Sequence, residues 1–69
     1  MNLNMMNKSI QFISYEYPDL ITLRIDETIY TYRSSEYYCR RFINSYQKGG
    51  RFNSFNLFKS NSNLIRKGE

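Results

Sequence analysis

Two alternating runs of residues, separated by a two-residue gap, constrain the fold of this chain most strongly. Residues 20–25 read LITLRI and residues 28–33 read TIYTYR, with only Asp26 and Glu27 between them. Apolar and polar residues that alternate over such lengths are typical of half-buried strands. A two-residue gap between two such runs predicts an antiparallel β-hairpin.

The short loop also predicts which residues lie opposite each other, because cross-strand partners point to the same face of a sheet. The predicted pairs are Ile25 with Thr28, Leu23 with Tyr30, and Ile21 with Tyr32. These pairs put the apolar side chains on one face, which we expect to lie inside. The other face is predicted to carry Thr22, Arg24, Thr31, Arg33 and the apolar Ile29.

A further strand is predicted before the hairpin, over residues 9–17. Its apolar residues change phase, with Ile10 and Phe12 in one phase and Ile13, Tyr15 and Tyr17 in the other. Such a change indicates either a β-bulge near Phe12 and Ile13 or a strand that is covered on both faces. The Pro18–Asp19 pair predicts a turn into the hairpin.

A helix is predicted directly after the hairpin and is expected to run to about residue 48. A serine pair before Glu36 supplies an N-cap, and Glu36 itself places a carboxylate in the first turn. The helix is expected to end at Gly49 and Gly50, because glycine adopts the left-handed conformation that follows many helices. Its apolar residues recur with helical spacing and form a stripe expected to be buried, Cys39, Phe42, Ile43 and Tyr46.

A short second helix is predicted over residues 54–59, with Asn53 as its N-cap. The phenylalanines expected to pack back on the sheet are Phe52, Phe55 and Phe58. Residues 1–7 are interpreted as a flexible leader and residues 61–69 as a polar tail. The chain is therefore predicted to form one α+β domain over residues 8–60. In it, a three-stranded antiparallel meander is followed by one amphipathic helix packed on the sheet and by the short second helix.

This order of elements resembles the KTSC domain, a small bacterial module named for the C-terminus of some lysyl-tRNA synthetases. The module also occurs as a stand-alone protein. The likeness covers residues 9–59 and is carried by Ile10, Ile13, Tyr15, Tyr30, Tyr32, Gly49, Phe52 and Asn53. The resemblance implies a β-β-β-α fold and an RNA-binding role, and it supplies no established activity to transfer.

The composition argues against an enzyme or a metalloprotein. Cys39 is the only cysteine and histidine is absent, which excludes an internal disulfide and a zinc site built from Cys and His. Without a histidine to serve as its base, Cys39 is expected to pack in the core. The acidic pair Asp26–Glu27 lies at a predicted turn without supporting ligands. We therefore expect no catalytic residues, no metal and no cofactor.

The location and origin of the chain are also indicated by its composition. The sequence has no apolar run long enough for a transmembrane helix and no pattern of a signal peptide. With a lone cysteine, this favours the cytoplasm and argues against a membrane partner. Alanine and valine are absent while Asn, Ile and Lys are frequent, as in the A/T-rich genomes of low-GC bacteria and their phages.

The positive charge of the chain is concentrated in its second half. The net charge is +4, and residues 37–68 carry seven basic residues and no acid. This asymmetry suggests an acidic partner, which could be nucleic acid, a nucleotide or an acidic protein surface. On the predicted helix, Tyr37 lies three and four positions before Arg40 and Arg41, so the ring and both guanidinium groups share one face. The predicted contact surface comprises Tyr37, Arg40, Arg41, Asn44 and Lys48, extended by Arg33 and Arg51.

Each of these signals has a structural alternative. The basic helix face could simply be solvated. Tyr30 and Tyr32 could stack on bases, although their predicted face favours the core. The glycine pair between Lys48 and Arg51 could bind an anion, although a helix cap is favoured because the helix C-terminus repels anions.

Two classes of function remain open. The leading interpretation is a non-enzymatic binding module for RNA, single-stranded nucleic acid or a nucleotide-like anion. The alternative is a phage-encoded inhibitor or sponge, which blocks a host defence or nucleic-acid-handling protein or sequesters a signalling nucleotide. A homodimer is also expected, because so small a chain lacks a disulfide or metal to stabilise it. Its candidate contacts are Leu20, Ile29 and an exposed edge strand.

Overall fold

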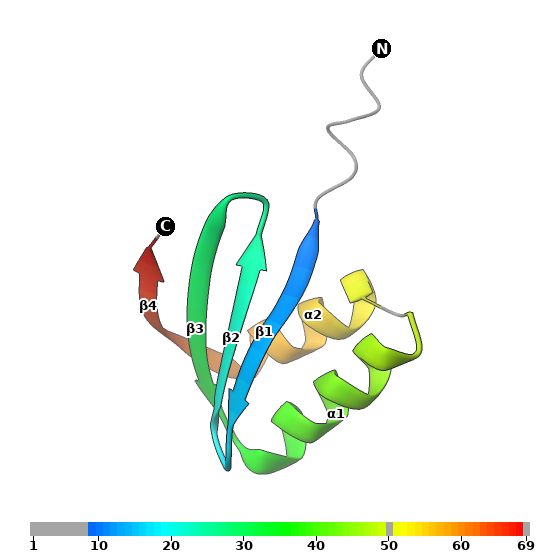
Figure 1. The fold of residues 1–69 in the computed structure, drawn as a ribbon. Helices are drawn as coiled ribbons and strands as arrows, with labels where there is room; N and C mark the ends of the chain where they lie inside the picture. The colour runs from blue at the N-terminus through cyan, green and yellow to red at the C-terminus, as the bar shows by residue number, and fades with distance from the viewer. Residues whose placement is uncertain (1–8, 50, 69) are drawn as a thin grey trace.

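The computed structural model of the chain describes residues 9–49 and 51–68. They form four strands and two helices in the order β1 (Ile10–Glu16), β2 (Leu20–Ile25), β3 (Thr28–Ser34), α1 (Glu36–Gln47), α2 (Arg51–Ser60) and β4 (Ser62–Gly68). The strands make one antiparallel sheet in the order β1-β2-β3-β4, and both helices lie on the same side of it (Figure 1). The α+β class is confirmed. The predicted leader, residues 1–7, lies outside the described residues.

The hairpin between β2 and β3 has the predicted register. Leu23 lies opposite Tyr30 and Ile21 opposite Tyr32, and the loop consists of two residues. Asp26 has a φ of 57°, a left-handed conformation that Asp tolerates better than most residues and that a tight hairpin turn requires. On the face turned away from the helices, the Thr22 and Thr31 hydroxyls lie 3.2 Å apart. Leu20 and Ile29, the predicted dimer contacts, are half-buried.

Strand β1 contains the predicted bulge, between Phe12 and Ser14, where its register against β2 shifts. The strand forms one edge of the sheet, and Tyr46 of α1 reaches it. The Tyr46 hydroxyl accepts a hydrogen bond from the Phe12 amide at 3.1 Å and donates one to the Ile10 carbonyl at 3.2 Å. A helix side chain thus satisfies two backbone groups that face away from β2.

Helix α1 begins and ends where the sequence predicts. The Ser35 hydroxyl caps its first turn by accepting a hydrogen bond from the Tyr38 amide at 3.2 Å. At the other end Lys48 is the C-cap, and Gly49 follows with a φ of 96°. A side chain at Gly49 would be strained in this conformation, which explains why the helix ends at a glycine.

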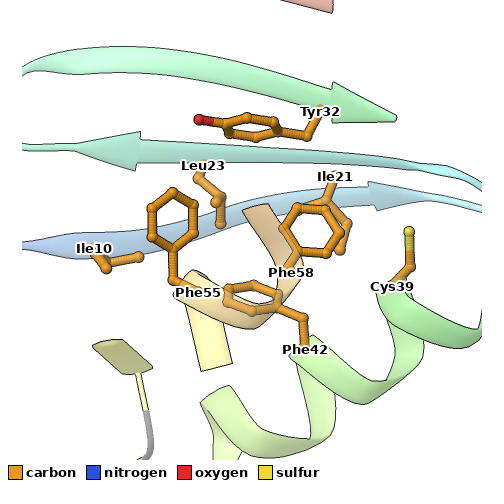
Figure 2. Close-up of a cluster of buried hydrophobic side chains, with 8 residues drawn as sticks. All are labelled: Ile10, Ile21, Leu23, Tyr32, Cys39, Phe42, Phe55 and Phe58. Atoms are coloured by element: carbon orange, nitrogen blue, oxygen red, sulfur yellow. The ribbon is translucent and has the colours of Figure 1, made fainter. Parts of the chain in front are cut away.

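Aromatic rings connect the sheet to both helices. The buried cluster consists of Ile10, Ile21, Leu23, Tyr32, Cys39, Phe42, Phe55 and Phe58 (Figure 2). Tyr32 of β3 contacts Phe58 of α2 edge to face, with ring centroids 5.8 Å apart. Phe58 in turn packs against Phe42 of α1 at 5.2 Å. Phe58 therefore contacts both the sheet and the first helix.

The predicted polar tail is wrong, because most of residues 61–69 forms β4. This strand pairs antiparallel with β3, from Ser34 opposite Ser62 to Ile29 opposite Gly68. Every β4 residue after Ser62 is exposed, so the strand is held mainly by its backbone ladder and not by buried side chains. The sheet thus has four strands, not three, and the folded domain reaches Gly68 instead of ending at residue 60.

The second helix also differs from its prediction. It begins at Arg51, so Asn53 lies inside the helix and is not its N-cap. Phe55 and Phe58 are buried as expected, whereas the Phe52 side chain lies outside the described residues. In the described part of the chain, neither helix is long and apolar enough to cross a membrane.

Candidate nucleic-acid interface

One exposed face of α1 gathers four of the predicted contact residues. Tyr37, Arg40, Arg41 and Asn44 line an open depression of about 420 Å³. The cause is helical phase: Cys39 and Phe42 are buried, so residues on the opposite side of α1 project outward. We call these four residues the α1 face.

Hydrogen bonds orient the side chains of the α1 face. An Arg41 guanidinium nitrogen donates to the Tyr37 hydroxyl at 3.1 Å. The Tyr37 ring also meets the Tyr38 ring edge to face, with centroids 4.9 Å apart. Tyr37 nevertheless stays 61% exposed, which leaves enough ring surface for contact with a planar group. The ring is therefore held in place yet accessible.

The two arginines differ in their electrostatic surroundings. Arg40 donates to the Glu36 carboxylate at 3.1 Å, a surface ion pair that partly neutralises its charge. Glu36 also accepts a hydrogen bond from the Tyr17 hydroxyl at 3.3 Å. Arg41 has no acidic partner within ion-pair distance among the described residues. An anion at this face would therefore meet its strongest unneutralised charge at Arg41.

Lys48 and Arg33 do not line this depression. Lys48 is exposed at the C-cap of α1. Arg33, at the end of β3, forms an ion pair with Asp19 at 3.1 Å, which holds its guanidinium at the turn before β2. The Arg51 side chain lies outside the described residues. Among the side chains that the structure describes, the compact site therefore consists of the α1 face.

Two further hollows adjoin the α1 face and were not expected from the sequence. One, of about 320 Å³, is lined by Tyr15, Arg40, Ile43, Asn44 and Gln47. The other, of about 330 Å³, lies between the helices and is lined by Tyr38, Arg41, Phe42, Ser45, Asn53, Ser54, Leu57 and Phe58. Helical periodicity could have indicated Gln47, but the contribution of α2 depends on how the helices pack.

The remaining sequence candidates take structural positions. Tyr32 is buried, whereas Tyr30 is only half-buried and stacks beside it at 6.1 Å. Gly49 ends α1, as the cap interpretation expects. No group of three His, Cys, Asp or Glu residues that could hold a metal ion occurs in the described ranges 9–49 and 51–68.

The thiol of Cys39 is expected to be unreactive in the folded protein. Its side chain is fully buried, and burial raises the pKa of the thiol to about 11, with Asp19 adding to the rise. Because the thiolate is the reactive form, a disulfide reagent at pH 8 should modify the native chain at least about 100-fold more slowly than the urea-unfolded chain. Equal rates in the two states would show that Cys39 is accessible.

Comparisons with protein-family models, with curated proteins and with solved structures found no match to this chain. The resemblance to the KTSC domain therefore stays a prediction. The chemistry of the α1 face is the basis for assigning a function.

Proposed function

We propose that this chain is a non-enzymatic module that binds RNA or another single-stranded nucleic acid through the α1 face. The observation that carries the proposal is the single depression shared by an accessible tyrosine, two arginines and an asparagine. Guanidinium groups donate paired hydrogen bonds to phosphate, and an exposed ring can stack on an unpaired base.

Each side chain has a distinct part in this proposal. Arg41, which lacks an acidic partner among the described residues, contacts a phosphate directly. Arg40 binds a phosphate by exchanging its ion pair with Glu36 for the phosphate contact. The exchange costs little free energy because exposed ion pairs are weak. Tyr37 stacks on a base, and the Asn44 amide is available to hydrogen-bond a base edge or a sugar.

The proposal is tested with a binding panel under varied salt. Fluorescein-labelled oligouridylate, oligothymidylate, a duplex of equal length and free nucleotides are titrated with the chain and followed by anisotropy. Single strands should bind more tightly than the duplex, because Tyr37 requires an unstacked base. The logarithm of affinity should fall with the logarithm of salt concentration, with a slope of about −0.7 per phosphate contact. Absence of binding to every nucleic acid and nucleotide would refute the proposal and favour a protein partner.

Replacing Tyr37 with alanine should weaken binding to single strands by about 1–3 kcal/mol, the usual contribution of one stacked base. Tyr37→Phe keeps the ring but loses the hydrogen bond from Arg41, so it separates stacking from the positioning of Arg41. Leu64→Ala removes a side chain of similar exposure, 50%, on β4 and serves as the control. If Tyr37→Ala and Leu64→Ala bind equally well, the ring does not contact a base.

A further inference from the structure

Another hollow lies at the other side of the core, between the sheet and α2. It has a volume of about 250 Å³ and is lined by Ile10, Ile25, Tyr30, Tyr32, Phe55, Asn56 and Lys59. It shares no lining residue with the α1 face. Figure 2 shows Ile10 and Phe55 at one end of the buried cluster, with Cys39 at the opposite end. We call this hollow the α2 pocket.

Five of the seven residues that line the α2 pocket are aliphatic or aromatic, and Asn56 and Lys59 add polar groups. Ile10 and Phe55 belong to the buried core, and Ile25 packs against it. The rings of Tyr30 and Tyr32 are stacked, with centroids 6.1 Å apart and an angle of 24° between their planes. These side chains present flat hydrophobic surfaces, which favour an aromatic ring or another apolar part of a ligand.

Lys59 of α2 lines the α2 pocket, and Lys67 of β4, which is not a lining residue, lies beside the lining residue Tyr30. The Lys59 ammonium of α2 lies 5.9 Å from the centroid of the Phe55 ring. The Lys67 ammonium of β4 lies 5.8 Å from the centroid of the Tyr30 ring, opposite which Lys67 is paired in the sheet. Neither lysine has an acidic partner within ion-pair distance among the described residues, and no carboxylate lines the pocket. Lys59 therefore places a cation in the pocket wall, and Lys67 places a second cation beside Tyr30.

At the C-terminus of α2, which could repel an anion, four carbonyls accept hydrogen bonds from nearby polar groups. The donors are Ser60 Oγ to the Asn56 carbonyl at 2.8 Å, Asn61 Nδ2 to Leu57 at 2.9 Å, the Asn61 amide to Phe58 at 3.0 Å, and Ser62 Oγ to Lys59 at 3.2 Å. Asn61 and Ser62, which follow the helix, thus supply donors that the helix lacks. The charge of Lys59 is not needed to satisfy these carbonyls.

We propose that the α2 pocket binds a small aromatic anion. The ring of the ligand packs against Tyr30 and Phe55, and its anionic group faces the Lys59 ammonium, with Lys67 beside Tyr30 as the second cation. The volume, about 250 Å³, is below the range of pockets for drug-sized molecules, so it suits one or two fused rings. The recognised chemistry is an anionic group on a flat apolar body, which a carboxylate or a phosphate ester could supply.

The first experiment locates binding with isoleucine methyl groups. Protein labelled at the isoleucine δ1 methyls is titrated with 2-naphthoate and followed by methyl NMR. Ile10 and Ile25 line the pocket, so their signals should shift and saturate, whereas Ile13 and Ile43 lie outside it and should not move. 2-Naphthyl phosphate distinguishes the two kinds of anionic group. If Ile10 and Ile25 do not shift with either compound at millimolar concentration, the proposal is overturned.

The second experiment tests the two cations. Lys59→Gln with Lys67→Gln should lower the affinity for 2-naphthoate at least about tenfold, as loss of two close charges predicts. Both lysines are exposed, so the melting temperature should hardly change. The control, Lys48→Gln with Arg24→Gln, removes the same charge elsewhere and should bind 2-naphthoate with unchanged affinity.

The proposal would be overturned if the uncharged 2-naphthamide bound as tightly as 2-naphthoate, or if the Lys59/Lys67 variant kept its full affinity. Binding of naphthoate does not depend on the α1 face, so the two proposals can fail separately.

Discussion

Replacing Tyr32 with alanine is expected to destabilise the domain by about 3–5 kcal/mol, the usual cost of deleting a large buried aromatic side chain. Tyr32 is only 5% exposed, and its ring meets Phe55 and Phe58 edge to face at 6.0 and 5.8 Å. A domain of 69 residues has a total stability of roughly 3–10 kcal/mol. The variant should therefore be largely unfolded or close to its midpoint at room temperature.

Urea unfolding followed by far-ultraviolet circular dichroism measures this effect. Tyr32→Phe keeps the ring contacts and should lose much less stability, which isolates the contribution of the ring. Tyr30→Ala should be milder than Tyr32→Ala, because Tyr30 is only half-buried and lines the α2 pocket. A Tyr32→Ala protein that melts within a few degrees of the original would show that this ring is not part of the core.

Reversing both arginine charges of the α1 face should abolish binding to single-stranded nucleic acid. Arg40→Glu with Arg41→Glu removes two cationic contacts and places two negative charges beside the phosphates. We expect the affinity at low salt to fall by at least about 100-fold, with a shallower salt dependence, because each lost phosphate contact reduces the slope by about 0.7. The melting temperature should change little, since both residues are exposed and the Arg40–Glu36 pair is a surface contact.

The matched control for this variant reverses two arginines on the sheet. Arg24→Glu with Arg66→Glu makes the same change in net charge, and both residues are exposed on strands away from α1. This control should lose only the long-range part of the attraction and retain most of its affinity. If the two double variants lose affinity equally, binding depends on net charge alone and the α1 face has no specific role.

The hairpin and the first helix could be predicted because their signals are local. The two-residue loop leaves one register for Leu23 and Tyr30, and a slip of one residue would turn every apolar side chain to the wrong face. The outward direction of Tyr37 and Arg41 follows from the burial of Cys39 on the same helix. The hairpin register follows from the two-residue repeat of a strand, and the direction of Tyr37 and Arg41 follows from the repeat of about 3.6 residues in a helix.

Strand β4 and the α2 pocket could not be predicted because their signals are not local. Residues 62–68 have neither alternation nor a high preference for strands, and they form one because the free edge of β3 offers backbone partners. The same pairing brings Lys67 to Tyr30. Phe55 and Lys59 are neighbours one turn apart on α2, and the packing of α2 brings this pair to Tyr30 and Tyr32. The sequence separates Phe55 and Lys59 from Tyr30 and Tyr32, and only the fold shows that these residues line one pocket.

The two edges of the sheet are unequal, and this limits how copies of the chain could join. At the β1 edge, Tyr46 already engages the Ile10 carbonyl and the Phe12 amide, and the adjoining bulge disturbs the ladder that an added strand would need. At the opposite edge, no described strand pairs with the outer side of β4. Two chains that paired through β4 would cover this edge on each other, so the pair would have two-fold symmetry. At the β1 edge, the Tyr46 hydroxyl would hinder the addition of a further chain, and this would disfavour growth of a fibre.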